Sequence, residues 1–252
     1  MSGEAPRIRV VGRGRAGGSF ARALSSVGWN VDLVAGRGSG PVHSGDTDVV
    51  LIAVPDEAVA TVAGRVEPST AVVAHCSGSL TLEHLSPHLS VASIHPLMSL
   101  SSAETGAHLL VGAWFAVAGD ATTGHALALE LVGALGGRPV EVPDDVRTRY
   151  HATAVVASNH LVALLGQVER LAAEAGVPLE AYHDLIAGTL ANVTAHGATA
   201  ALTGPAARGD WDTVRRHLAD LPEQERPLYL VLAGAAADLV GRPVPTDLRV
   251  ST

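Results

Sequence analysis

The stretch Val10–Gly17, which reads V-V-G-R-G-R-A-G, decides the fold of this chain. It overlaps the end of a short β-type run, Ile8–Val11, and precedes a stretch with helical apolar spacing, Gly17–Gly28. In a G-x-G-x-x-G loop, the first glycine allows a tight turn, the second lets a pyrophosphate approach the backbone, and the third lets helix and strand pack closely. Free N–H groups at the start of the helix then attract the phosphates. The stretch predicts a dinucleotide-binding strand–loop–helix unit; the alternative is a structural turn in a chain with 27 glycines.

The end of the second predicted strand, Val31–Ala35, indicates which dinucleotide binds. NAD-binding chains usually carry an acidic residue there for the ribose hydroxyls. Here Asp32 lies inside the strand, and Arg37 follows it, which suits a 2′-phosphate. We therefore predict NADP, with a solvated Arg37 as the alternative. The predicted cofactor contacts are Gly12, Arg13, Gly14, Arg15, Ala16, Gly17, Arg37, Val54, Pro55 and Ser77.

Alternating strand and helix signals predict an α/β Rossmann domain with a mostly parallel sheet over residues 1–143. The predicted strands are Ile8–Val11, Val31–Ala35, Val49–Val54, Ala71–Ala74, Val91–Ile94, Trp114–Ala118 and Pro139–Val142. Predicted helices cover Gly17–Gly28, a stretch capped by Asp56 that runs to about Arg65, and Asp120–Leu135, whereas Gly36–Asp46 reads as an irregular loop.

The sequence pattern over residues 144–252 predicts an all-α domain, which we expect to bind substrate and to form a dimer interface. Helical patterns cover Val146–Ala175, Leu179–Ala200, Trp211–Ala219 and Glu223–Val240, and Leu202–Asp210 reads as a turn-rich break. The apolar surface of these helices exceeds what one short bundle can bury, so we expect a homodimer.

Composition excludes several classes of protein. With 252 residues, 47% hydrophobic, 17% charged and a mean hydropathy of +0.28, the chain is too apolar to be disordered. Its net charge of −8 argues against a nucleic-acid partner. All 17 basic residues are arginine, which excludes lysine-based catalysis. The single Cys76, the short polar N-terminus and apolar runs too short to span a bilayer predict a cytoplasmic protein with no membrane partner.

Two strand ends carry polar side chains at the edge where parallel sheets bind ligands. Ser77 follows one strand, and we expect it to contact cofactor or substrate; the alternative is that Ser77 or Ser79 caps a turn. His95 ends the next strand, and we expect a substrate contact; the alternative is a bond to a loop carbonyl. We predict no metal site, because Pro87 interrupts the turn between His84 and His88.

The long predicted helix carries a polar stripe. Arg147, His151 and Ser158 share one face, since seven residues return a helix to within about 20°. Asn159 lies at the edge of the stripe, and mostly apolar residues surround it. We predict that His151, Ser158 and Asn159 are catalytic and that Arg147 binds substrate; the alternative is an exposed polar face. Arg208, in the turn-rich break, would bind a carboxylate, or else pair with Asp210 or Asp212 to hold its loop.

Motifs outside the glycine loop point to a known family. They are Ala53-Val54-Pro55-Asp56, His75-Cys76-Ser77-Gly78-Ser79, Ile94-His95-Pro96-Leu97, Tyr150-His151-Ala152, Ser158-Asn159 and Leu202-Thr203-Gly204-Pro205 with Arg208-Gly209-Asp210. With these, the whole chain resembles bacterial Rossmann-like proteins that carry the domain of unknown function 2520 at their C-terminus. That family is similar in architecture to the 6-phosphogluconate dehydrogenase-like group, which includes β-hydroxyacid dehydrogenases, pyrroline-5-carboxylate reductases and ketopantoate reductases.

The resemblance implies reduction of an oxo acid, with 2-dehydropantoate (ketopantoate) in pantothenate biosynthesis as the specific candidate. The lysine–asparagine pair of the β-hydroxyacid dehydrogenases does not carry over, because Val155 stands four residues before Asn159. We therefore predict an NADP-dependent oxidoreductase in which His151 donates the proton, since an imidazole titrates near neutrality. The alternatives are a non-catalytic NADP(H)-binding sensor and an imine or amino-acid reductase.

Overall fold

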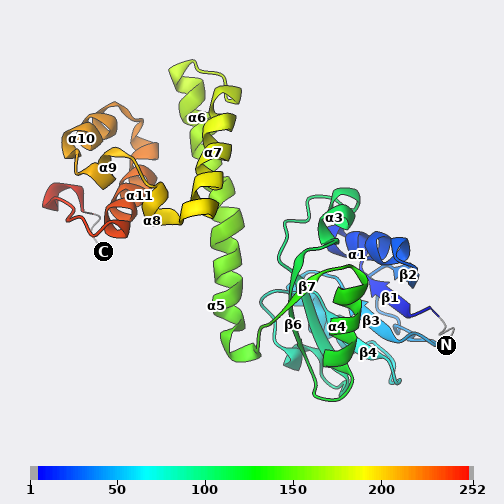
Figure 1. The fold of residues 1–252 in the computed structure, drawn as a ribbon. Coiled ribbons are helices and arrows are strands. Elements are labelled where there is room, and N and C mark those ends of the chain that lie inside the picture. The colour runs from blue at the N-terminus through cyan, green and yellow to red at the C-terminus, as the bar shows by residue number, and fades with distance from the viewer. Residues whose placement is uncertain (1–4, 250–252) are drawn as a thin grey trace. The chain divides into compact units, whose positions relative to one another are not determined.

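Short β-branched runs build one sheet in the computed structural model, which describes residues 5–249 (Figure 1). Its strand order is β2-β1-β3-β4-β5-β6-β7. The strands are β1 (Arg7–Val11), β2 (Asn30–Val34), β3 (Val49–Ile52), β4 (Val72–His75), β5 (Val91–Pro96), β6 (Trp114–Gly119) and β7 (Arg138–Glu141). Neighbouring strands run parallel except for β5 and β6, which are antiparallel. The predicted mostly parallel Rossmann sheet is confirmed.

The order of the strands indicates at which edge of the sheet a ligand would bind. The chain moves from β1 outward to β2 and then returns to β3 on the other side of β1. Such a reversal opens a crevice at the carboxyl ends of the two central strands, where open α/β sheets bind ligands. The glycine loop leaves β1 at this edge.

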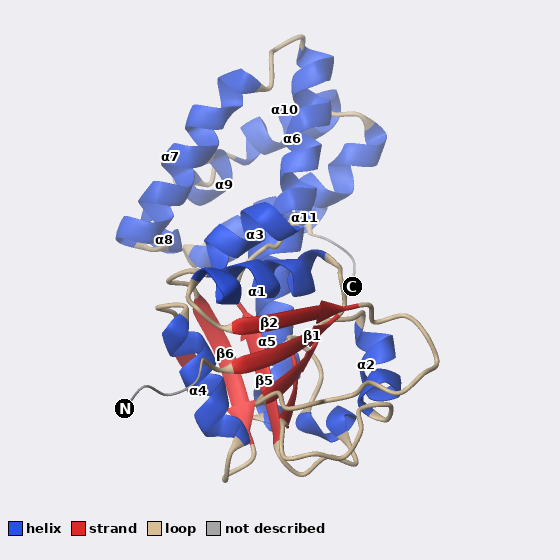
Figure 2. Cartoon of the chain, turned by 90° about the vertical axis from the view of Figure 1, so that its right-hand side faces the viewer, coloured by secondary structure: helices blue, strands red, loops and turns tan. Residues whose placement is uncertain are grey.

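Side chains alternate between two buried faces of the sheet. One face packs with α1 (Arg15–Ser26), α3 (Ala103–Leu110) and α4 (Gly124–Ala134), and its core includes Phe20 and Phe115. Helices α1 and α3 lie side by side on that face (Figure 2). The other face packs with α2 (Asp56–Ala63) and the 3₁₀ turn η1 (Leu82–Leu85). Because side chains alternate along β4 and β5, His75 and Ser93 share this second face with Val73 and Val91.

Two compact units divide the chain: Met1–His160 and Leu161–Thr252. The first therefore includes α5 (Asp144–Val155) and the π-turn η2 (Val156–His160), beyond the predicted boundary after residue 143. In the second unit every described element is helical, which confirms the predicted helical C-terminal part. These elements are α6 (Leu161–Ala175), α7 (Glu180–His196), α8 (Ala198–Ala201), α9 (Pro205–Arg208), α10 (Trp211–Asp220), η3 (Glu223–Glu225), α11 (Arg226–Leu239) and η4 (Thr246–Leu248).

Local structure differs from the sequence predictions in several places, and the π-turn η2 interrupts the helix predicted over Val146–Ala175. Helix α3 was not expected, and α9 replaces part of the expected turn-rich break. The carboxylate of Asp120 accepts backbone N–H groups of Val91, Thr122, Thr123 and Gly124, so α4 begins at Gly124 rather than Asp120. Asp56 is the first residue of α2, and Pro55 takes the predicted cap position.

Within residues 5–249, none of the helices combines the length and apolar character needed to cross a bilayer.

Candidate functional site

The glycine loop has the geometry of a phosphate cradle. Gly12 adopts a φ of +129°, and a side chain there would collide with the carbonyl oxygen of Ala53. A side chain at Gly17 would collide with the carbonyl of Gly12. Gly14 begins α1 and has open space where a Cβ would stand, and no side chain caps this helix. The first N–H groups of α1 are therefore available to an anion, so the loop fits the pyrophosphate of a dinucleotide.

Charged residues beside β2 match the expectation for a 2′-phosphate. Asp32 is bound by Arg9, whose Nε lies 2.8 Å from the carboxylate, so this acid is already paired at its place within the strand. Arg37 is exposed, and its guanidinium has no hydrogen bond or ion pair to another residue of the described chain. Arg13 is also exposed and donates only a long bond, 3.4 Å, to the carbonyl of Leu33. Two guanidinium groups therefore stand open to solvent near this end of β2.

Residues after β3 close the loop from the other side. The side chain of Val54 lies against Gly12 and Gly36, both of which lack the space for a Cβ. Pro55 follows as the residue before α2. This contact holds the ends of β1, β2 and β3 together around the glycine loop.

Ser77 is held in a local network. Its hydroxyl donates to Asp56 across 2.8 Å and accepts the N–H groups of Ser79 and Leu80, each at 3.2 Å. Ser79 donates to the same carboxylate across 2.6 Å. The predicted turn-forming role of Ser77 is thus present, and its contact with a cofactor stays a prediction.

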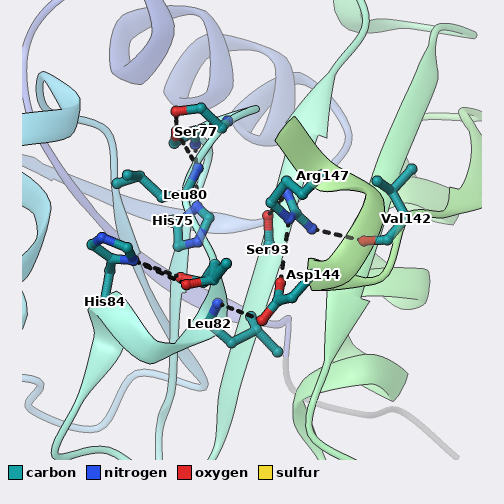
Figure 3. A network of polar contacts seen from close by, with 11 residues as sticks. His75, Ser77, Leu80, Leu82, His84, Ser93, Val142, Asp144 and Arg147 are labelled. Atoms are coloured by element: carbon teal, nitrogen blue, oxygen red, sulfur yellow. Dashed lines mark hydrogen bonds and ion pairs between the residues drawn. The ribbon is translucent and has the colours of Figure 1, made fainter. Parts of the chain in front are cut away.

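Arg147 anchors α5 to the sheet instead of lying open to a substrate. Its side chain is fully buried, and it donates to Ser93 Oγ across 2.9 Å and to the carbonyl of Val142 across 3.0 Å. Asp144 pairs with its Nε at 3.4 Å (Figure 3). The predicted substrate contact of Arg147 is therefore corrected: because its face of α5 covers the sheet, the guanidinium satisfies interior acceptors.

His75 belongs to the same buried layer as Arg147 (Figure 3). Its Nδ1 accepts the N–H of Ser77 across 3.2 Å, while Nε2 is buried without a hydrogen-bond partner among the described residues. Burial, followed by the charge of Arg147, lowers the pKa of His75 to about 4. The imidazole is therefore neutral at neutral pH.

Two other imidazoles converge on Gly78. A Cβ on this glycine would lie 2.7 Å from both His151 Nδ1 and His95 Nε2, so only glycine leaves these two nitrogens in place. The rings have centroids 6.1 Å apart and meet edge-on. His151 Nδ1 is buried without a partner in the described chain. The structure thus brings together two side chains, His95 and His151, that the sequence proposed separately.

Tyr150 fixes the orientation of His95. Its hydroxyl lies 2.7 Å from His95 Nδ1, and burial raises the pKa of Tyr150 to about 12, so the hydroxyl keeps its proton and can donate it. Burial and then the neighbouring His151 lower the pKa of His95 to about 4, so this ring is neutral. When the Tyr150 hydroxyl donates to Nδ1, the proton of the neutral His95 ring lies on Nε2, the nitrogen that faces Gly78. Sequence reasoning missed both Tyr150 and Gly78, although each stood inside a quoted motif.

A cavity of about 470 Å³ opens beside these rings. Ser158 and Asn159 line it from the π-turn η2, a distortion that is frequent at functional sites. The predicted polar residues His95, His151, Ser158 and Asn159 therefore share one cavity. Its full lining is His95, Pro96, Leu97, Met98, Ser99, Tyr150, His151, Thr153, Ala154, Val155, Ala157, Ser158 and Asn159.

Arg208 lies in the second compact unit, at the end of α9. It is exposed and donates to the carbonyl of Thr203, whereas Asp210 caps α10 through Thr213 and Asp212 pairs with Arg215. The alternative that Arg208 forms an ion pair with Asp210 or Asp212 is not seen among the described residues, where these acids bond Thr213 and Arg215 instead. Its contact with a substrate carboxylate stays a prediction.

Known proteins share this architecture. Residues 113–236 match the family described as Domain of unknown function (DUF2520). A Bacteroides fragilis protein provisionally named an NADP oxidoreductase superposes with a TM-score of 0.79 at 21% identity, covering 93% of this chain and 98% of its own. A Thermotoga maritima protein gives 0.71 at 25% identity, with 92% and 98% covered. No curated protein matches the sequence.

The 1-pyrroline-5-carboxylate reductase of Streptococcus pyogenes has a TM-score of 0.62 at 14% identity, and the match covers 93% of this chain and 99% of the reductase. At such low identity this likeness establishes the fold alone. The fold is that of the Rossmann-type proteins with a helical C-terminal part, and the expected similarity in architecture to pyrroline-5-carboxylate reductases is confirmed.

Proposed function

We propose that the chain is an NADP-dependent oxidoreductase that reduces a small carbonyl or imine compound. One observation carries the proposal. A dinucleotide-type glycine loop and a cavity bordered by two converging imidazoles, His95 and His151, occur in the same compact unit. The name of the Bacteroides fragilis neighbour, an NADP oxidoreductase, supports the cofactor.

The residues around the glycine loop would hold NADP(H). Gly12, Gly14 and Gly17 shape the cradle for the pyrophosphate, and Arg37 and Arg13 offer guanidinium groups to the 2′-phosphate. Bound NADPH would supply the hydride for the reduction. The chain's own side chains must supply the proton and hold the substrate.

His151 is the proton donor in this proposal. The carbon of a reduced carbonyl takes the hydride, and its oxygen takes a proton to become a hydroxyl. His151 lines the cavity, and its Nδ1 has no hydrogen-bond partner among the described residues. This nitrogen is therefore not engaged by another side chain and could serve the substrate. His95 is kept neutral by burial and is oriented by its hydrogen bond to Tyr150, and in the tautomer protonated on Nε2 it would donate a hydrogen bond to the substrate without giving up its proton. Ser158 and Asn159 would orient the rest of the substrate.

Oxo acids are the first substrates to test, and ketopantoate is the specific candidate from the resemblance described above. Cyclic imines test the second candidate, for which the shared fold with a pyrroline-5-carboxylate reductase is the favouring observation. Oxidation of NADPH, followed by absorbance, would be measured against a panel of both. Tight NADPH binding without turnover of any compound would favour a non-catalytic sensor instead.

Substitution of His151 tests the catalytic assignment. Loss of a positioned general acid costs on the order of 10²–10⁴ in rate, so H151A should lower kcat by that factor. NADPH affinity should change little, because the glycine loop supplies the cofactor contacts. H160A is the matched control, since His160 lies on the same helical stretch, is exposed and is absent from the cavity lining. An H151A protein with normal kcat and a lower melting temperature would assign His151 a purely structural role.

A further inference from the structure

The cavity beside His95 and His151 is also lined by apolar side chains, and the proposed function gives these side chains no role. Leu97 and Met98 follow β5 and line the cavity with 43% and 42% of their surface exposed. The backbone of this segment is fixed, because the N–H of Leu97 donates to the carbonyl of Trp114 across 2.9 Å. Two large apolar side chains thus border the cavity and keep part of their surface exposed within their compact unit.

A second segment adds apolar side chains to the same lining. Ala154, Val155 and Ala157 line the cavity from α5 and η2, and Pro96 lines it beside Leu97. Scattered single apolar side chains on a surface need no explanation. Here, however, apolar side chains from two segments distant in sequence line one cavity together with the two imidazoles. This arrangement has the composition of a small-molecule site, mostly apolar with a few polar groups, and its volume lies within the usual range of about 300–1,000 Å³.

We propose that the substrate carries a hydrocarbon substituent on its reacting carbonyl or imine carbon, and that this substituent occupies the apolar part of the cavity lining. The substituent packs on Leu97, Met98 and Val155, while the reacting group lies at His95 and His151. This inference rests on the proposed function, because it concerns the substrate of that same site. Its physical basis is the removal of apolar surface from water on both sides of the contact.

A homologous series of substrates measures this contact. The straight-chain 2-oxo acids from 2-oxobutanoate to 2-oxooctanoate differ only in methylene groups. Each methylene that moves from water into an apolar site contributes a factor of about four. We expect kcat/KM with NADPH to rise by about that factor per methylene until the cavity is filled. The L97N substitution should flatten the series, because an amide in place of the isobutyl group removes the apolar wall without changing its size greatly.

L89N is the matched control. Leu89 is 90% exposed and does not line the cavity, so this substitution changes surface polarity equally without touching the site. The control should keep the chain-length dependence of the wild type. Equal kcat/KM along the series in the wild type, or the same flattening in L89N, would overturn the proposed apolar subsite. Neither result would contradict the proposed reductase activity.

Binding without turnover separates failure of this inference from failure of the proposed function. The same acids would be added to the protein with NADP⁺, which has no hydride to give, and the shift in melting temperature would be recorded. Shifts in melting temperature that grow with chain length and disappear in L97N support the apolar subsite even if no acid is reduced. In that case only the proposed reductase activity is overturned. If the acids neither shift the melting temperature nor oxidise NADPH, both proposals are overturned.

Discussion

Among single residues, we propose Arg37 as the one that sets which dinucleotide the chain prefers. It is exposed and has no internal partner in the described chain, whereas the nearby acid, Asp32, is neutralised by Arg9. A carboxylate at position 37 would repel a 2′-phosphate and accept the hydroxyls of an unphosphorylated ribose. R37D should therefore weaken NADPH binding by about tenfold or more and leave NADH binding unchanged or tighter. Fluorescence titration of both cofactors checks this, and equal affinities in the wild type would contradict the NADP assignment.

His75 links stability to pH. Its pKa is about 4 in the folded protein against 6.5 when unfolded, so between these values the unfolded chain binds a proton that the folded chain rejects. The free energy of unfolding should therefore fall as pH falls from about 6.5 to 4, by an amount on the order of 3 kcal/mol for this residue. His95 should add a similar slope for the same reason. Urea unfolding at several pH values should show a shallower slope in H75Q, and H183Q, at an exposed position, should keep the wild-type slope.

Among the elements, strand β3 could be predicted because its apolar run, Val49–Ile52, is continuous, whereas helix α3 could not be predicted. Its sequence, AETGAHLL, contains Gly106 at its centre, which disfavours a helix. The structure shows why glycine is there: a Cβ would collide with the Ser19 side chain of α1. Packing between two helices that are distant in sequence therefore stabilises α3, and no local pattern reports such a contact. The π-turn η2 likewise has no signature in its sequence, Val156–His160.

Helix α5 depends on Arg147 for its place on the sheet. Replacing this side chain would leave Ser93 and the carbonyl of Val142 without their donor and create a cavity at a fully buried position. R147A should lower the free energy of unfolding by about 3 kcal/mol. R149A, an exposed arginine two residues further along the same helix, should change it by less than about 0.5 kcal/mol. Chemical denaturation measures both, and equal effects would mean that Arg147 does not anchor the helix.

At the scale of the whole molecule, the candidate site joins segments that are far apart in the chain. Gly78 follows β4, His95 lies near the end of β5, and His151 lies in α5. The strand-end rule and the helical stripe placed His95 and His151 as separate candidates. Their meeting at Gly78 depends on the buried contact between Arg147 and Ser93, which sets α5 over β5. Sequence reasoning assigned that arginine to substrate, because an arginine on an otherwise apolar helix gives the same local pattern whether it binds a ligand or an interior carbonyl.

Helix α7 argues for a second copy of the chain. It has 17 residues and buries none of them, although it carries Leu185, Leu190 and Val193, which are 65%, 47% and 39% exposed. A helix of this length is marginal in water without tertiary packing, so its apolar side chains must be covered in the assembled protein. The homodimer predicted from the sequence would provide that cover. Light scattering should give the mass of a dimer, and L185D should shift it toward the monomer. V111D, which introduces the same charge at a 57% exposed valine in the other compact unit, should stay dimeric; a wild-type monomer at every concentration would refute the dimer.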